Sequence, residues 1–281
     1  MSIIVEAADA PVAKLPLWPT VRLAYATYFA HFGEGLKIAA LWLPLVAGVA
    51  AIGGWLQAAL IAQLLANPQT AIDVAQPAHL LMLGYARNLL LAFAAVSSAV
   101  AWHRLLLLNE APRFGGNIGT RSLWRYVGAG LLICLIAALP PAIVLVPMAL
   151  LGLLPSVGKA PPAEFAIIAL AYLAGVVLMM RLSVLLPARA TGNATLSLKD
   201  AWQRSRGNTW RLLGGIVLCT VPPFLLIDLI FVGLTAVPFG AGAYLAQWAA
   251  ASAIALCCWL LTWPIWVGFL SHAYRHLSGP A

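Results

Sequence analysis

Long apolar runs separated by short polar segments dominate the chain, and this pattern predicts membrane-spanning helices. A helix needs roughly 20 apolar residues to cross a bilayer. Runs of that length lie at about 36–65, 80–108, 124–154, 165–186, 210–237 and 243–269. The sequence therefore predicts an all-α fold, a polytopic membrane helix bundle of about six transmembrane helices in a single membrane domain at 18–281.

Two shorter amphipathic segments are predicted to form interfacial helices. Residues 18–32 place aromatic side chains at helical spacing, which favours the membrane interface; a helix packed on the bundle is the alternative. Residues 197–207 begin with Ser197 and Asp200, a pattern typical of a capping box. The opening segment 1–17 lacks the pattern of a cleaved signal peptide, and we expect it to be mobile.

Two proline pairs lie inside predicted spans, Pro140-Pro141 in the third and Pro222-Pro223 in the fifth. Proline removes a backbone donor, so we expect each pair to kink or break its helix. Neighbouring helices would then have to satisfy the carbonyl groups that are left free.

The composition agrees with a membrane protein. The 281 residues are 63% hydrophobic and 9% charged, whereas a soluble domain carries roughly a quarter of its residues as charged side chains. The positive charge concentrates in alternate loops and near both termini, which predicts cytoplasmic termini under the positive-inside rule. A basic run interleaved with aromatic residues is missing, so we expect no nucleic-acid binding.

A basic residue opens every second span, in the pairs Leu36-Lys37, Trp124-Arg125 and Trp210-Arg211. One interpretation is a threefold array of helical hairpins around a central pathway or site. The other is that each entering helix needs an interfacial residue and a snorkelling base. We favour the second, because such short matches arise easily at membrane boundaries.

Two segments carry a family resemblance: Leu-Pro-Ala-Arg-Ala-Thr-Gly at 186–192 and Leu-Lys-Asp-Ala-Trp-Gln-Arg-Ser-Arg-Gly-Asn-Thr-Trp-Arg-Leu-Leu-Gly at 198–214. They resemble bacterial multi-pass proteins similar to the membrane domain associated with glycerophosphodiester phosphodiesterases. The resemblance implies a six-helix bundle in the bacterial inner membrane. These 281 residues leave no room for the catalytic barrel, so we do not expect the phosphodiesterase activity to carry over.

Few polar residues are candidates for a site. Asp228 is the one acidic residue inside a predicted span, a position that suggests a proton or cation step. It lies about 27 Å along its helix, so we favour a carboxylate that simply reaches water. Candidate contacts to an anion or a lipid headgroup, with snorkelling as the alternative, are Arg104, Arg181, Arg189, Arg204, Arg206 and Arg211.

Catalytic and metal sites are harder to assemble. His272 and His276 are four residues apart, as two metal ligands would be, but no neighbouring carboxylate or cysteine completes a set. The cysteines lack ligand spacing, and the serines have no assignable histidine and carboxylate partners. We therefore expect no metal, no cofactor and no assignable catalytic residue. On this basis we favour a protein that is not an enzyme.

Three functions are compatible with this pattern. The leading one is a membrane scaffold, assembly or interaction protein, with the lipid bilayer and a membrane-protein partner as its contacts. The second is a small transporter or channel that uses the proline-broken spans and Asp228. The third is a protein that binds or modifies anionic lipid headgroups. A water-filled cavity that reaches Asp228 would favour transport, and a sealed apolar core would count against it.

Overall fold

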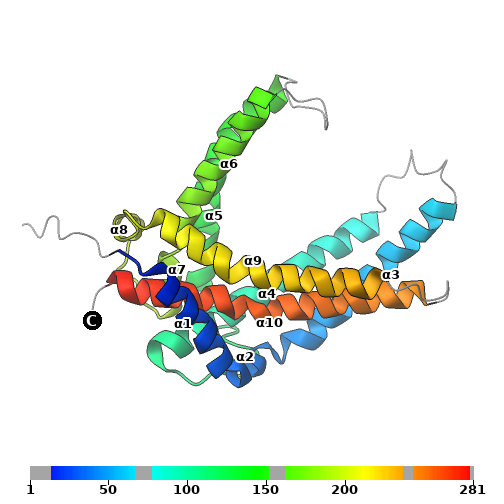
Figure 1. Ribbon diagram of the computed structural model, residues 1–281, viewed down its shortest axis with the longest axis horizontal. Helices are drawn as coiled ribbons and strands as arrows, with labels where there is room; N and C mark the ends of the chain where they lie inside the picture. Colours follow the sequence, from blue (N-terminus) through cyan, green and yellow to red (C-terminus); the bar gives the residue numbers. More distant parts are fainter. Residues whose placement is uncertain (1–13, 67–77, 152–161, 237–242, 279–281) are drawn as a thin grey trace, which may run out of the picture.

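The structure, a computed structural model, describes residues 14–66, 78–151, 162–236 and 243–278, which form helices and no strands (Figure 1). The helices are α1 (Leu17–Ala30), α2 (Phe32–Ala39), α3 (Trp42–Ala66), α4 (Ala78–Leu108), α5 (Arg121–Leu150), α6 (Pro162–Leu182), α7 (Leu185–Ala190), α8 (Leu198–Arg204), α9 (Thr209–Ala236) and α10 (Tyr244–Ser278). Six of them, α3, α4, α5, α6, α9 and α10, are long and apolar enough to cross a membrane. The prediction of an all-α polytopic bundle is confirmed.

Helix α10 lies at the centre of the arrangement. It packs against α3, α9, α4 and α1, and Figure 1 shows α9 alongside it over most of its length. Helices α5 and α6 pack mainly on each other and leave the other spans at a steep angle (Figure 1). Helices α3, α4, α9 and α10 thus form one packed group, and α5 and α6 form a separate pair.

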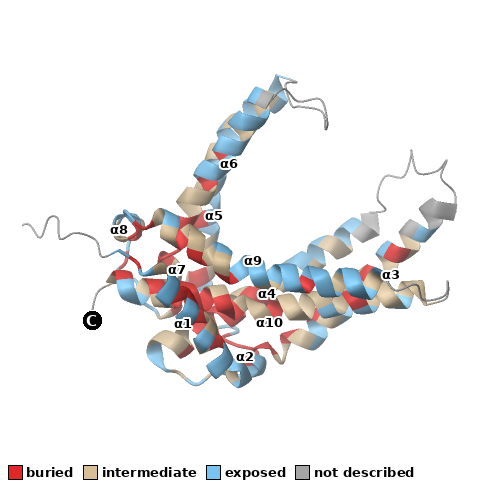
Figure 2. Ribbon diagram, viewed as in Figure 1, coloured by how far each residue is buried: buried red, intermediate tan, exposed pale blue. Residues whose placement is uncertain are grey.

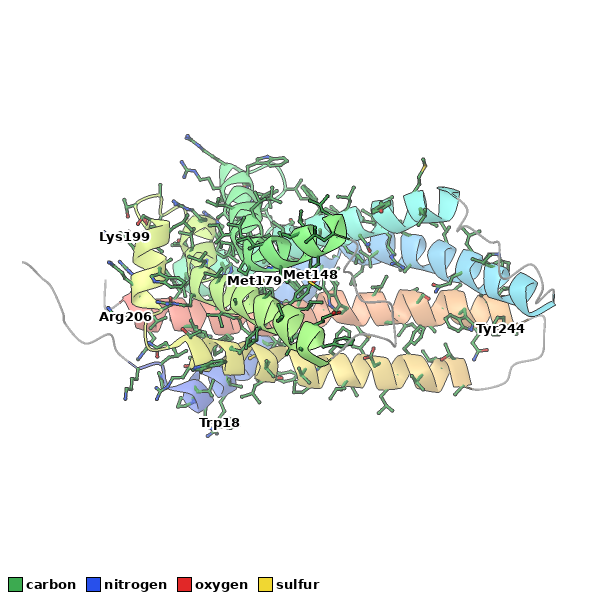
Figure 3. All side chains as sticks on the ribbon, turned by 90° about the horizontal axis from the view of Figure 1, so that it is seen from above. Trp18, Met148, Met179, Lys199, Arg206 and Tyr244 are labelled. Atoms are coloured by element: carbon green, nitrogen blue, oxygen red, sulfur yellow. The ribbon has the colours of Figure 1, made fainter. Side chains whose placement is uncertain are left out.

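The short helices and the connecting loop 109–120 gather at one end of the bundle, which we call the basic end; the opposite end is the far end. Lys199 and Arg206 lie there, away from Tyr244 (Figure 3). Among the described residues, every lysine and arginine except Arg87 belongs to the basic end. The Nε2 atom of His276 lies 3.3 Å from the backbone oxygen of Lys14, so the two ends of the described chain meet there.

The tightest packing also lies at the basic end, where Figure 2 shows the buried residues of α1, α4 and α10 close together. Trp102 and Phe269 are among the largest fully buried side chains. The outer faces of α5, α6 and α9 carry exposed leucine, isoleucine and valine side chains. Such faces are stable only against lipid or another apolar surface.

Several element boundaries differ from the predicted ones. The first span begins at Trp42, because the chain turns between α2 and α3 and the Trp42 indole donates a hydrogen bond to the oxygen of Gly115. At the other end of the chain, α10 continues through the tail to Ser278. The N-terminal amphipathic helix α1 buries Val21 and Ala24 against α9 and α10, so the packed alternative describes it better than a purely interfacial helix.

The predicted mobile segment 1–17 lies outside the described residues except for its last four. Within these, Leu15 is fully buried, and its backbone N–H donates to Oδ1 of Asn208 at 2.8 Å. The chain is therefore fixed to the start of α9 before α1 begins.

The proline pairs do not break their helices. Helix α5 runs through Pro140 and Pro141, and α9 runs through Pro222 and Pro223. Of the two expected outcomes, a kink or a break, the break is therefore wrong. Proline at position 141 frees the carbonyl of Ala137 four residues earlier. Gly175 of α6 approaches that carbonyl so closely that a Cβ atom there would overlap it. Helix α6 therefore packs directly against the carbonyl that the proline frees.

Gly215 allows α9 to contact α10. A Cβ atom at this position would overlap the ring of Phe269, and that ring has no free space because it is fully buried. At the adjacent Gly214, the nearest atom to such a Cβ is 3.6 Å away, on Leu17. The two glycines are adjacent on α9, but only Gly214 has room for a side-chain methyl group.

We expect Gly215→Ala to destabilise the protein by about 1–3 kcal/mol, because an extra methyl group in a packed core forces neighbouring groups to move. Gly214→Ala is the matched control and should be neutral or slightly stabilising, since alanine favours helix. Thermal unfolding in detergent checks both. Equal midpoints for the two variants would contradict the packing described.

Candidate functional site at the basic end

Arg104, near the end of α4, links two segments of the basic end. Its Nε donates to a carboxylate oxygen of Glu110 at 2.7 Å, and the same oxygen is 2.5 Å from the second terminal nitrogen. The remaining terminal nitrogen donates to the oxygen of Ala190 at 3.1 Å. Hydrogen bonds with an ionised partner are the stronger kind, so Arg104 holds the end of α7 against α4.

Arg181 has a similar role between α6 and α8. It donates to the oxygen of Trp202 at 2.7 Å and to the hydroxyl of Ser205 at 3.3 Å. Its guanidinium carbon lies 3.3 Å from the centre of the Trp202 ring, in the arrangement of a cation–π contact. The charge is therefore satisfied by the protein itself.

Three more arginines bind backbone oxygens. Arg189 donates to the oxygens of Asn193 and Leu196, Arg211 to that of Leu15, and Arg275 to that of Leu106. The last four carbonyls of a helix and the carbonyls of loops lack helical partners, and arginine can donate five N–H bonds. These residues fasten the polar chain segments to one another.

The predicted set of headgroup contacts is thus divided by the structure. Arg104, Arg181, Arg189 and Arg211 bind other parts of the chain. Arg204 and Arg206 make no hydrogen bond or ion pair with the described residues. Arginines that hold the fold have fewer donors left for a ligand, so the site has to be sought at the less occupied cations.

Helix α8 is fixed at its start by the predicted capping box, which the structure confirms. The hydroxyl of Ser197 accepts from the backbone N–H of Asp200, and the carboxylate of Asp200 accepts from the backbone N–H of Ser197. Two hydrogen bonds from Ser197 lower the pKa of Asp200; the bond from its side chain has the larger effect and the bond from its backbone the smaller. The box therefore stabilises α8 above the acidic pH range and loses its effect as pH falls through the lowered pKa.

A cleft of about 430 Å³ opens between α5 on one side and α7 and α8 on the other. Two arginines and a serine form its polar part, and small or apolar side chains form the rest. The lining residues are Arg125, Gly128, Ala129, Leu132, Leu185, Arg189, Ser197 and Leu198. This cleft combines open space with two arginines, of which Arg189 also donates to backbone oxygens.

Arg125 was not among the predicted contacts. It makes no hydrogen bond or ion pair with the part of the chain that the structure describes, in contrast to Arg189 across the cleft. The Trp-Arg pair that opens the third span was the one sequence feature that could have pointed to Arg125. The fifth span opens with the same pair, and its Arg211 binds a backbone oxygen instead. Only the tertiary contacts separate the two.

The cleft is charged at its rim and apolar below. Leu132 lies seven residues beyond Arg125 on α5, about 10 Å along the helix. Between them a Cβ atom at Gly128 would meet no atom within 4 Å, so this helix face leaves room. The arrangement matches an anionic headgroup with an attached hydrocarbon chain.

Asp228 lies apart from this site. It is exposed on α9, next to the buried Ile227, and is not among the residues that line the cleft between α5, α7 and α8. The small space beside it, about 30 Å³ between α9 and α10, has Ile227 but not Asp228 in its wall. A role of Asp228 in proton or cation transfer stays a prediction.

Buried polar groups elsewhere connect helices. The Nδ1 of His103 lies 2.7 Å from the hydroxyl of Ser271, which itself donates to the oxygen of Val267. Both residues are fully buried, and a histidine–serine pair without an open approach cannot reach a substrate. The pair ties α4 to α10.

The two tail histidines bind different partners. His272 lies 3.1 Å from the hydroxyl of Thr27, and His276 contacts the backbone of Lys14. Within the described ranges, no group of three or more His, Cys, Asp or Glu residues is arranged to hold a metal ion.

No family model, curated protein or solved structure matches the chain. The resemblance to membrane domains associated with glycerophosphodiester phosphodiesterases therefore stays a prediction.

We expect Arg181→Gln to destabilise the protein by about 2 kcal/mol, because a charge-assisted hydrogen bond and a stacking contact are lost together. Arg206→Gln, a variant of an exposed arginine in the same region, should change stability little. Chemical unfolding in detergent micelles compares the two. Similar losses in both variants would show that the Arg181 contacts do not hold α6 and α8 together.

Proposed function

We propose that this protein is a multi-pass protein of the bacterial inner membrane that binds the headgroup of an anionic phospholipid at its basic end, without catalysing a reaction. The observation that carries the proposal is the cleft between α5 and α7–α8, with Arg125 and Arg189 above apolar walls. A lipid phosphate is the ligand that this combination suits, since its charge and its chain are covalently joined.

Charge supports the orientation in this proposal. Under the positive-inside rule the basic end faces the cytoplasm, where anionic lipids attract basic residues near the membrane surface. Arg189 already donates to two backbone oxygens, and this fixes its guanidinium at the rim. Arg125 then supplies the donors that are still available, and arginine binds phosphate oxygens in pairs.

The test measures lipid retention by native mass spectrometry after reconstitution with equal amounts of phosphatidylglycerol and phosphatidylcholine. We expect Arg125→Gln to lower phosphatidylglycerol retention about tenfold, because it removes the free cation of the cleft. Gly128→Leu should have a similar effect by filling the space below the rim, with all charges kept.

The chain offers a matched control for each variant. Arg121→Gln removes an exposed charge one turn earlier on α5, and Gly130→Leu adds a side chain where a Cβ also meets nothing within 4 Å. Neither residue lines the cleft, so both variants should retain phosphatidylglycerol as the wild type does. If the cleft variants and their controls lose lipid equally, the proposal fails.

A membrane scaffold is the second candidate, and the α5–α6 hairpin favours it. The hairpin leaves the other spans (Figure 1), and Leu135 and Ile143 are among its strongly exposed apolar residues. Another membrane helix pair would cover these faces as well as lipid does.

Cys134 is exposed on α5 and provides a natural probe of that hairpin. If the hairpin docks on a partner, a bifunctional thiol reagent applied to native membranes should give one adduct of defined mass. Cys134→Ser should abolish that adduct. A diffuse pattern, or an adduct that survives the substitution, would count against the scaffold.

A further inference from the structure

The far end of the bundle contains a second cleft, between α3 and α4. Its volume is about 310 Å³. Four of its wall residues are polar and the remainder are small or apolar: Gly53, Gln57, Leu60, Leu81, Leu83, Gly84, Tyr85, Arg87 and Asn88. The basic-end cleft lies at the opposite end of α4, so the two are separate.

Arg87 is the unusual member of this cleft. It lies six residues inside the membrane-crossing part of α4, which begins at Leu81, about 9 Å along the helix. Its Nε atom is buried and has no hydrogen-bond partner. A buried donor on a charged group without a partner is costly, so something other than the described residues is expected to satisfy it.

The neighbouring polar groups define the chemistry of a ligand. Gln57 from α3 and Asn88 from α4 bring amide groups to the cleft, and Tyr85 brings a hydroxyl group. None of the described residues that line it is acidic, so no carboxylate among them balances the positive charge of Arg87. The planar guanidinium matches the paired oxygens of a carboxylate or phosphate.

Glycine leaves the necessary space. A Cβ atom at Gly53 or at Gly84 would meet no atom within 4 Å, although these residues lie on the facing helices α3 and α4. A side chain at either position would project into the opening instead of against a packed surface. The cleft is therefore open because of glycine on both sides.

We propose that the α3–α4 cleft is a binding site for an oxyanion, a phosphate or carboxylate group held by Arg87 with help from Gln57, Tyr85 and Asn88. The group belongs either to a lipid of the leaflet at the far end or to a small free anion that enters from that side. This site is independent of the lipid cleft at the basic end.

The test uses the full chain carrying Arg125→Gln, so that the basic-end cleft does not contribute to the signal. The protein is placed in phosphatidylcholine nanodiscs, and thermal unfolding is followed while inorganic phosphate is titrated. In a second arm, phosphatidylglycerol replaces part of the phosphatidylcholine. A ligand that binds the folded state raises the unfolding temperature in proportion to its occupancy.

We expect stabilisation in at least one arm, and an apparent affinity about tenfold weaker in Gly84→Leu and in Arg87→Gln. Gly48→Leu is the matched control, because a Cβ at Gly48 also meets nothing within 4 Å and that residue lies outside the cleft. Arg87→Lys keeps the charge but loses the planar fork, and should fall between wild type and Arg87→Gln.

The two arms distinguish the sources of the anion. A response to inorganic phosphate identifies a free oxyanion, and a response to phosphatidylglycerol alone identifies a lipid headgroup. The proposal is overturned if neither probe stabilises the protein, or if Gly84→Leu and Gly48→Leu respond alike.

Discussion

The basic end depends on one kind of interaction, the hydrogen bond from an arginine side chain to a backbone oxygen of a distant segment. Carbonyl groups at helix ends and in loops lose their helical partners and need another donor. Arg211 satisfies the oxygen of Leu15, and Arg275 that of Leu106. Each bond removes an unsatisfied acceptor and fixes two segments that are far apart in the sequence.

This constraint gives the two ends of the molecule different properties. At the basic end, helices converge on a buried centre around Trp102 and Phe269, and the loops are tied to it. Towards the far end, the faces of α5, α6 and α9 are largely exposed (Figure 2), and α3 and α4 leave a cleft between them. The two clefts thus lie in different settings, one beside the packed basic end and one between helices that leave a gap.

The sequence predicts the fold well and the site poorly, for identifiable reasons. Apolar run length fixes the spans, because the bilayer sets a minimum length, and the capping box at Ser197 is a local pattern that needs no tertiary information. In contrast, Arg125 and Arg211 follow a tryptophan in the same way, yet Arg211 binds the backbone of Leu15 and Arg125 lines an open cleft. Their partners lie elsewhere in the chain, so only packing distinguishes a structural arginine from one that is free.

The same limit applies to the helix interiors. The prolines of α5 are readable in the sequence, but the approach of Gly175 to the freed carbonyl of Ala137 depends on how α6 packs. Arg87 looks like an isolated charge near a helix start, and its significance comes from the buried Nε and from the glycines that open the cleft, Gly84 on α4 and Gly53 on α3. Local sequence patterns therefore predict the helices, whereas the clefts depend on how the helices pack against one another.

The most direct test of this account is an experimental structure of the protein in nanodiscs that contain phosphatidylglycerol, with an antibody fragment bound to provide size. If the cleft binds phosphatidylglycerol, headgroup density should lie within hydrogen-bonding distance of Arg125, and hydrocarbon density should pass Gly128 towards Leu132. A cleft closed by α8, or one in which Arg125 pairs with another protein side chain, would contradict it.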